Sequence, residues 1–281
     1  MHTSDGRRPK LAIERIGGRE IRYAVWKARP GSGDRRPILF FNGIGANIEL
    51  MSPLAEWISD RDIVTFDMPG VGGSPPPRLP YRPWMIARMT MRLLDHLGYD
   101  KVDVMGVSWG GGMAQQFAFQ HPSRVGKLIL AATSPGMLMV PGEIGALSKM
   151  ANPRRYFDTQ FMKDNFRALY GDEENSAGDH ADRISPPTRR GYAYQLGAMV
   201  GWTSAPFLPF LRQKTLVLMG SEDRIVPVVN GKILAGLIPR ARLEIVAGGH
   251  LFLVSRAAES VPHIKAFLAE SDVDFEAKRA A

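Results

Sequence analysis

Residues 104–112 read Val-Met-Gly-Val-Ser-Trp-Gly-Gly-Gly, and they join a short apolar run to an amphipathic stretch through the pattern Gly-x-Ser-x-Gly. This pattern is typical of a nucleophile elbow, a sharp turn that holds a serine, here Ser108, in a strained conformation between a strand and a helix. Glycines flank such a serine because side chains there would collide with neighbouring backbone. Five residues can match by chance. The role of Ser108 therefore depends on whether the chain also supplies a base, an acid and an oxyanion hole.

Short apolar runs alternate with helical periods on both sides of this turn. Runs of this kind are typical of strands that are covered on both faces of a sheet. The alternation predicts an α/β fold with a mostly parallel, eight-stranded sheet, flanking helices and right-handed crossovers. The first two strands are predicted to form an antiparallel hairpin. The predicted strands cover residues 11–16, 21–27, 37–41, 62–67, 102–106, 125–131, 215–220 and 241–246.

The alternation stops in the middle of the chain and resumes near its end. Between residues 134 and 211 the sequence changes to methionines, aromatic residues and prolines at helical spacing, with no strand-like run. We therefore predict a core made of residues 1–133 and 212–281, with a helical cap (lid) inserted at 134–211. The charged end of the chain, residues 272–281, is predicted to be a frayed tail.

The composition excludes several classes of function. The chain has 281 residues, 44% of them hydrophobic, and no cysteine, which excludes disulfides, thiolate metal sites and a cysteine nucleophile. It has no apolar run of about 18 residues and no secretory signal near its start, so we expect a cytoplasmic protein without a transmembrane segment. The net charge of +8 is spread over scattered arginine pairs, and no nucleic-acid partner is expected. The oligomeric state does not follow from the sequence.

A serine hydroxyl is a weak nucleophile that needs a base, and the base is usually held by a carboxylate. In the architecture to which the elbow belongs, the chain order is serine, acid, histidine, with each residue in a loop after a strand. His250 follows the strand predicted at 241–246, and Asp223 follows the strand predicted at 215–220. These are the predicted base and acid. Glu222 competes with Asp223, but we expect it to be solvated.

Attack on a carbonyl builds negative charge on oxygen, which preorganised N–H groups must meet. Trp109 follows the serine and offers its backbone N–H at a helix start. The loop after the strand at 37–41 reads Asn-Gly-Ile-Gly, and the N–H of Ile44 is the second predicted donor. The glycine-rich stretch 67–74 also follows a strand, but it lacks the lysine of a phosphate-binding loop and no helix starts on it. We interpret it as a structural turn.

The methionines and aromatic residues of the insertion have two interpretations. They could fill the core of the cap, or they could form an apolar wall that binds an acyl group. Their number favours the wall, and Asn42 belongs to the expected oxyanion loop. The predicted substrate-binding residues are therefore Asn42, Met137, Met139 and Trp202.

With these residues placed, the chain resembles the α/β-hydrolase superfamily and, more narrowly, the intracellular depolymerases of medium-chain-length poly(3-hydroxyalkanoate). Asn42 stands where most of the superfamily has histidine, and this fits the narrower group. The resemblance implies a Ser108, Asp223 and His250 triad, no cofactor or metal, and a storage polyester on cytoplasmic granules as substrate. The most specific segments are FNGIGAN (41–47), GVSWGG (106–111), AATSPGMLMVPG (131–142), PRRY (153–156), GWTS (201–204) and GHLFL (249–253).

Two other functions remain compatible with these residues. A carboxylesterase or lactonase that acts on small soluble esters would use the same triad and differ only in its cap. A protein that binds granules or partners without catalysis could also use this scaffold, although the complete triad argues against it. Activity on a long-side-chain polyester, compared with activity on small esters, separates the first alternative from a depolymerase.

Overall fold

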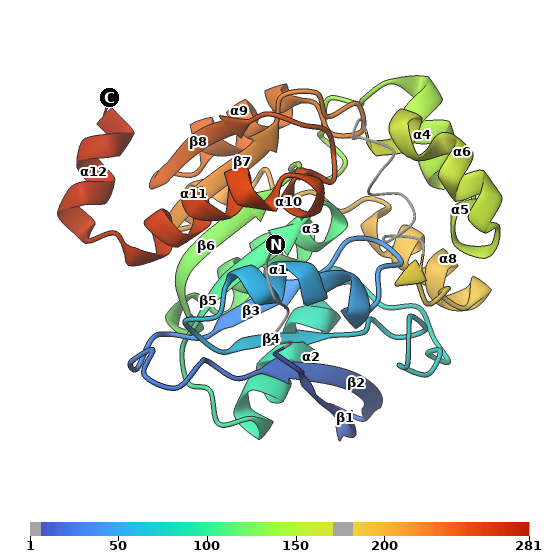
Figure 1. Cartoon of the computed structure of the whole chain (residues 1–281), viewed down its shortest axis with the longest axis horizontal. Helices are drawn as coiled ribbons and strands as arrows, with labels where there is room; N and C mark the ends of the chain where they lie inside the picture. Colours follow the sequence, from blue (N-terminus) through green and yellow to red (C-terminus); the bar gives the residue numbers. More distant parts are fainter. Residues whose placement is uncertain (1–6, 171–181, 281) are drawn as a thin grey trace.

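A computed structural model describes residues 7–170 and 182–280. It contains an eight-stranded sheet with the order β1-β2-β4-β3-β5-β6-β7-β8 (Figure 1). β2 runs antiparallel to β1 and β4, and all other neighbouring strands are parallel, so the predicted sheet with its N-terminal hairpin is confirmed. The strands are β1 (Lys10–Ile16), β2 (Arg19–Trp26), β3 (Ile38–Phe41), β4 (Ile63–Phe66), β5 (Val102–Val107), β6 (Val125–Ala131), β7 (Lys214–Gly220) and β8 (Ala241–Val246).

Helices cover both faces of this sheet. Successive side chains of a strand point to opposite faces, and in β6 Leu128 and Leu130 join one apolar cluster while Ile129 joins the other. The first cluster includes residues of α2 (Pro83–His96), α3 (Trp109–Gln120) and α9 (Val228–Leu237). The second includes residues of η1 (Ile48–Met51), α1 (Ser52–Trp57), α10 (Phe252–Ser255) and α11 (Ala257–Ala269).

The segment between β6 and β7 carries helices in its described parts, residues 134–170 and 182–211, and contributes no strand to the sheet there. Its two ends are tied together, because Met137 donates its backbone N–H to the carbonyl of Trp202 and Ser204 donates to that of Pro135. Where the cap begins and ends remains a prediction. Its elements are α4 (Ile144–Ala151), α5 (Arg154–Phe157), α6 (Thr159–Tyr170), α8 (Arg189–Met199) and η4 (Leu208–Phe210) (Figure 1).

The C-terminal end differs from the sequence-based expectation. Residues 272–280 form the helix α12 (Asp272–Ala280) instead of a frayed tail. Phe275 is fully buried, with its ring 5.9 Å from that of Phe267, and Lys214 lies 2.6 Å from the Asp272 carboxylate. One buried aromatic ring in a charged stretch thus holds the helix against the core. In the part of the chain that the structure describes, no helix has the length and apolarity needed to cross a membrane.

Candidate active site

The turn between β5 and α3 has the geometry of a nucleophile elbow. Ser108 has φ +54°, which side chains rarely adopt, and its backbone N–H bonds to the carbonyl of Ala131 at 2.9 Å. A Cβ on Gly106 would lie 2.3 Å from the carbonyl oxygen of Gly110, and a Cβ on Gly110 would lie 2.2 Å from that of Phe41. Glycine at both positions is therefore needed for the helix to start this close to the sheet.

The acid and base loops meet this serine at the carboxyl edge of the sheet. His250 Nε2 lies 2.9 Å from Ser108 Oγ, and His250 Nδ1 lies 2.7 Å from Asp223 Oδ2. The other carboxylate oxygen of Asp223 accepts the backbone N–H groups of Ile225 and Val226 at 2.9 and 2.8 Å. These bonds fix the carboxylate, which in turn selects the tautomer that leaves Nε2 as an acceptor for the serine hydroxyl.

The two loops are held against each other by their backbones. Ser221 donates its N–H to the carbonyl of Val246, and Glu222 donates its N–H to that of Gly248 at 2.8 and 2.9 Å, respectively. His250 and Asp223 are buried, whereas Glu222 is exposed. The structure therefore brings Asp223, and not Glu222, to the histidine.

The two predicted oxyanion donors come from segments next to the serine. Trp109 is the first residue of α3, and Ile44 belongs to the loop after β3 that lines the cavity beside Ser108. Within the described residues, neither backbone N–H donates a hydrogen bond. Both groups are therefore available to a ligand.

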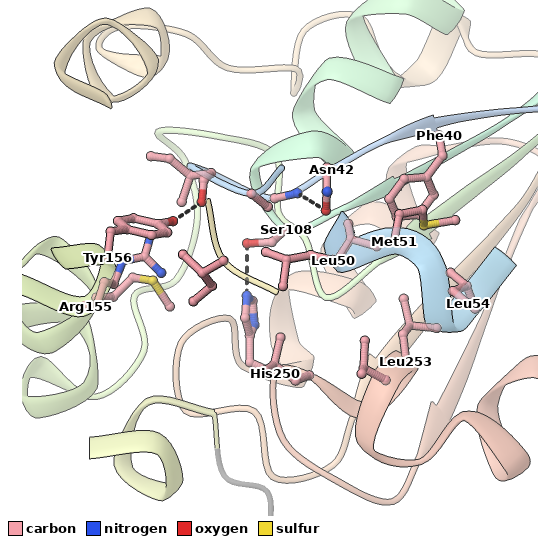
Figure 2. Close-up of a pocket in the computed structure, with 18 residues that line it drawn as sticks. Phe40, Asn42, Leu50, Met51, Leu54, Ser108, Arg155, Tyr156, His250 and Leu253 are labelled. Atoms are coloured by element: carbon pink, nitrogen blue, oxygen red, sulfur yellow. Dashed lines mark hydrogen bonds between the residues drawn. The ribbon is translucent and has the colours of Figure 1, made fainter. Parts of the chain in front are cut away.

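An apolar cavity of about 100 Å³ opens beside Ser108 (Figure 2). It lies between the loop after β3, helices η1, α1 and α10 of the core, and the cap. Most of its lining side chains are aliphatic or aromatic, and the polar ones are Asn42, Ser108, Arg155, Tyr156 and His250. The lining residues are Phe40, Asn42, Gly43, Ile44, Ala46, Leu50, Met51, Leu54, Val107, Ser108, Met150, Arg155, Tyr156, Ile184, His250, Leu251, Leu253 and Val254.

Comparisons with known proteins match this geometry. Residues 36–257 match the family model described as the alpha/beta hydrolase fold. The chain belongs to the α/β hydrolase family. It is 45% identical to a poly(3-hydroxyalkanoate) depolymerase of Ectopseudomonas oleovorans over 90% of both chains, and 30% identical to a 2-hydroxymuconate semialdehyde hydrolase of Pseudomonas putida over 91% of this chain and 95% of that one.

Solved structures share the fold of this hydrolase. An esterase of Exiguobacterium antarcticum superposes with a TM-score of 0.79 at 18% identity and covers 94% of this chain and 100% of that one. A hydrolase of Pseudomonas aeruginosa PA01 gives a TM-score of 0.77 at 20% identity and covers 93% and 99%. At such identities the likeness concerns the fold alone.

The structure distributes the four predicted substrate-binding residues unevenly. Asn42 lines the cavity, but its amide is used within the loop: Nδ2 donates to the carbonyl of Asn47 at 2.9 Å and Oδ1 accepts the N–H of Gly43 at 3.0 Å. Met137, Met139 and Trp202 do not line this cavity. For these three, a role in the substrate-binding wall stays a prediction.

Two of these three residues, Trp202 and Met139, contact the core instead. Trp202 is 8% exposed, and its Nε1 donates to Gln116 Oε1 of α3 at 2.9 Å. Met139 packs against the buried core, and Met137 lies at the surface with 62% of its area exposed. Trp202 and Met139 thus follow the alternative interpretation, in which such residues pack the cap, whereas Met150 and Tyr156 of the insertion line the cavity.

A large part of the apolar wall of the hydrolase pocket comes from the core, and Met150, Tyr156 and Ile184 add to it from the cap. Leu50, Met51 and Leu54 of η1 and α1 line the cavity together with Leu253 of α10 (Figure 2), and Val254 of α10 also lines it. The sequence analysis did not single out these residues, because an apolar face on a helix usually packs against a sheet. The apolar stretch directly after His250 was the one signal in the sequence, since residues that follow the base lie near the site.

The cap side of the pocket contains Arg155 and Tyr156, which the sequence analysis also did not assign to the site. The Arg155 guanidinium is buried and lies 4.2 Å from the centre of the Tyr156 ring. The Tyr156 hydroxyl donates a hydrogen bond to the carbonyl of Ile44 (Figure 2). The cap therefore contacts the loop that carries a predicted oxyanion donor.

A buried carboxylate fixes the far end of this loop. Asp67 accepts the backbone N–H of Ile48 at 2.8 Å and that of Gly73 at 2.8 Å, and Arg22 lies 3.0 Å away. Burial raises the pKa of Asp67, and these hydrogen bonds and Arg22 oppose the rise. The glycine-rich stretch 67–74 therefore acts as a structural turn around its own aspartate.

Proposed function

We propose that this hydrolase cleaves poly(3-hydroxyalkanoate) with medium-length side chains into 3-hydroxy acids or short oligomers. The observation that carries the proposal is the hydrogen-bonded series Ser108, His250 and Asp223 beside an apolar pocket. The 45% identity to a poly(3-hydroxyalkanoate) depolymerase supports the substrate class. The place of action that such a polymer implies is the surface of its storage granules in the cytoplasm.

The reaction proceeds in two acyl-transfer steps. His250 Nε2 takes the proton of Ser108, and the serine oxygen attacks the ester carbonyl to form a tetrahedral intermediate. This intermediate collapses to an acyl-enzyme as His250 gives that proton to the departing alcohol oxygen. A water molecule then gives a proton to the neutral His250 and attacks the acyl carbon, and His250 returns this proton to the Ser108 oxygen as the acid is released. Asp223 holds the imidazole in the required tautomer and stabilises its charged form.

Two backbone groups stabilise the intermediate. The N–H groups of Ile44 and Trp109 meet the negative charge that develops on the carbonyl oxygen, and the N-terminal end of α3 adds its dipole. The charge is stabilised by groups that are already in place, so no reorganisation is needed during the reaction. No metal or cofactor takes part in this scheme.

The apolar pocket accommodates the alkyl side chain of one monomer. A cavity of about 100 Å³ is smaller than the ~300–1,000 Å³ of pockets that enclose a whole ligand, so it suits one side chain better than a polymer segment. Each buried methylene contributes about 0.8 kcal/mol. Several methylenes against Leu50, Leu54 and Leu253 therefore favour long side chains over short ones.

The test compares three substrates with purified protein. We expect release of 3-hydroxy acids from granules of poly(3-hydroxyoctanoate), less release from poly(3-hydroxybutyrate), and hydrolysis of p-nitrophenyl octanoate. Ser108→Ala should abolish all three activities and leave the circular dichroism spectrum unchanged. Hydrolysis of p-nitrophenyl octanoate without any release from the polymers would favour a small-ester hydrolase, and turnover by Ser108→Ala would exclude the assigned nucleophile.

A further inference from the structure

Both polar atoms of one peptide unit in the loop after β3 are bound by side chains of the cap. The peptide unit links Ile44 to Gly45. Its carbonyl oxygen accepts the hydroxyl of Tyr156 from α5, and its N–H donates to Gln195 Oε1 from α8 at 2.9 Å. This peptide directly follows the N–H of Ile44, the proposed oxyanion donor. With the peptide between residues 44 and 45 held at both polar atoms, the neighbouring N–H of Ile44 has little freedom to rotate.

Gln195 also reaches the second proposed donor. The Nε1 of Trp109 donates to the backbone carbonyl of Gln195 at 3.1 Å. One cap residue thus bonds to the loop of Ile44 with its side chain and to Trp109 with its main chain. The two segments that supply the oxyanion donors are consequently connected through the cap.

The contact between the cap and the peptide at residues 44 and 45 is close and buried from solvent. Gln195 is fully buried, and a Cβ on Gly45, which has φ +68°, would lie 2.3 Å from the Tyr156 oxygen. The assignment of the Gln195 amide is fixed, since only its oxygen can accept the N–H of Gly45. Among the described residues its Nε2 has no hydrogen-bond partner. A buried amide with an unpaired donor is unfavourable for folding. Stability alone therefore does not account for a glutamine at this position, whereas the bond from its oxygen to the Gly45 N–H gives it a role in the site.

We propose that Gln195 and Tyr156 are positioning residues that clamp the peptide between residues 44 and 45 and so preorganise the oxyanion hole. The inference rests on the proposed function, because it takes Ile44 and Trp109 as oxyanion donors. It adds that the cap contributes to the chemical step, in addition to shaping the approach to the pocket. When the clamp is broken, the peptide can rotate and the donor at Ile44 loses its fixed direction.

Gln195→Met tests the clamp, because methionine has a similar size and lacks the acceptor oxygen. We expect kcat for p-nitrophenyl octanoate to fall about 10–100-fold with KM within twofold of wild type, since misplacing a donor costs less than removing one, which costs about 10²–10³. Tyr156→Phe should lower kcat in the same direction. Gln195→Glu keeps an acceptor oxygen and should restore kcat to within about fivefold of wild type.

Gln116→Met is the matched control. Gln116 Oε1 also accepts a buried N–H across the boundary between core and cap, from Trp202 at 2.9 Å, but away from the oxyanion loop. We expect its kcat within twofold of wild type and its melting temperature lowered at least as much as that of Gln195→Met. An alkylboronic acid, which forms a tetrahedral anion on Ser108, gives a second readout. Its inhibition constant should rise in Gln195→Met in proportion to the loss of kcat/KM.

The outcomes separate the clamp from the proposed function. Loss of kcat in Gln195→Met, rescued by Gln195→Glu and absent from Gln116→Met, supports the clamp. Equal losses in Gln195→Met and Gln116→Met, or unchanged boronate inhibition, overturn it while Ser108→Ala remains inactive. Turnover by Ser108→Ala overturns the proposed function itself. The soluble ester makes all these results independent of whether the polymer is hydrolysed.

Discussion

The site residues on the core side of the pocket come from loops that follow strands of the sheet, whereas those on the cap side come from helices of the cap. Ser108, Asp223 and His250 each follow a strand by a few residues, and the backbone bonds of parallel neighbours fix the loops that carry them. Tyr156 and Gln195 reach the same site from α5 and α8 through side-chain bonds. The core thus holds its reactive groups by backbone, and the cap acts on the site by single hydrogen bonds.

This difference determines how each side responds to substitution. A substitution in a core loop either removes a reactive group or introduces atoms that collide with the sheet, because these loops pack tightly against it. A change in the cap leaves the triad in place and alters the fit of one donor or one alkyl chain. We therefore expect large effects from the core loops that carry the triad and graded effects from the cap and the pocket wall.

The largest effect is expected from the core acid. Asp223→Asn should lower kcat about 10³–10⁴-fold, because an amide no longer selects the tautomer in which His250 accepts the serine proton. Glu222→Gln, one residue earlier and exposed, is the control and should change kcat less than twofold. Kinetics with p-nitrophenyl octanoate measure both. A larger loss of kcat from Glu222→Gln than from Asp223→Asn would show that Asp223 is not the acid.

Replacing a glycine with alanine should change the free energy of unfolding in opposite directions in the core and in the cap. Gly110→Ala should lower the free energy of unfolding by about 3 kcal/mol, since its Cβ meets the Phe41 carbonyl oxygen at 2.2 Å. Gly197→Ala should raise it by about 0.5–1 kcal/mol, because Gly197 lies exposed inside α8 with no atom within 4 Å of the new Cβ. Urea unfolding gives both values. Destabilisation by Gly197→Ala would show that α8 tolerates change as poorly as the elbow.

The core residues were predictable because their positions follow from local patterns and from topology. The elbow has a sequence pattern, and parallel strands bring the loops at their carboxyl ends to one edge, so Asp223 and His250 could be located from strand order alone. The pocket residues were not predictable in this way. Leu54 lies on an ordinary amphipathic helix, and only the three-dimensional arrangement shows that part of its apolar face borders a cavity.

The cap was less predictable because its contacts join distant parts of the chain. Tyr156 and Ile44 are 112 residues apart in sequence, and neither lies in a motif that requires the other. Trp202 was assigned to the pocket from residue type, although the same type suits packing against α3. The helix α12 was missed because, among its residues whose burial is described, Phe275 alone is buried.

Substitutions that change the volume of the cavity should alter the preference for substrate length. Val254→Phe adds volume to the wall of the cavity and should lower kcat/KM for p-nitrophenyl octanoate about tenfold relative to p-nitrophenyl acetate, which corresponds to the loss of one or two buried methylenes at about 0.8 kcal/mol each. Met137→Gln, at an exposed cap position that does not line the cavity, should leave this ratio unchanged. A changed ratio in Met137→Gln alone would move the acyl site to the outer cap.

The smallest expected effect concerns a core histidine remote from the triad. His121 follows α3, and its Nε2 is buried without a hydrogen-bond partner among the described residues. Burial lowers the pKa of His121, and the nearby Arg124 lowers it further. The folded protein therefore binds fewer protons than the unfolded chain just below the ordinary histidine pKa of about 6.5. Stability from the neutral ring is complete above this pH and is lost as the pH falls through it.

His121→Gln removes this titration. The difference in unfolding free energy between wild type and the variant should decrease from pH 7.5 to 5.5, by a fraction of the ~1.4 kcal/mol per pH unit that one full proton gives, because solvent screens a part-exposed ring. Urea unfolding at several pH values measures it, while the ratio of the two kcat/KM values should stay within twofold throughout. Parallel stability curves would mean that His121 titrates normally. A ratio of kcat/KM values that varied with pH would show that the charge of His121 acts through α3 on Trp109. The core would then have graded effects on the oxyanion hole, as the cap does.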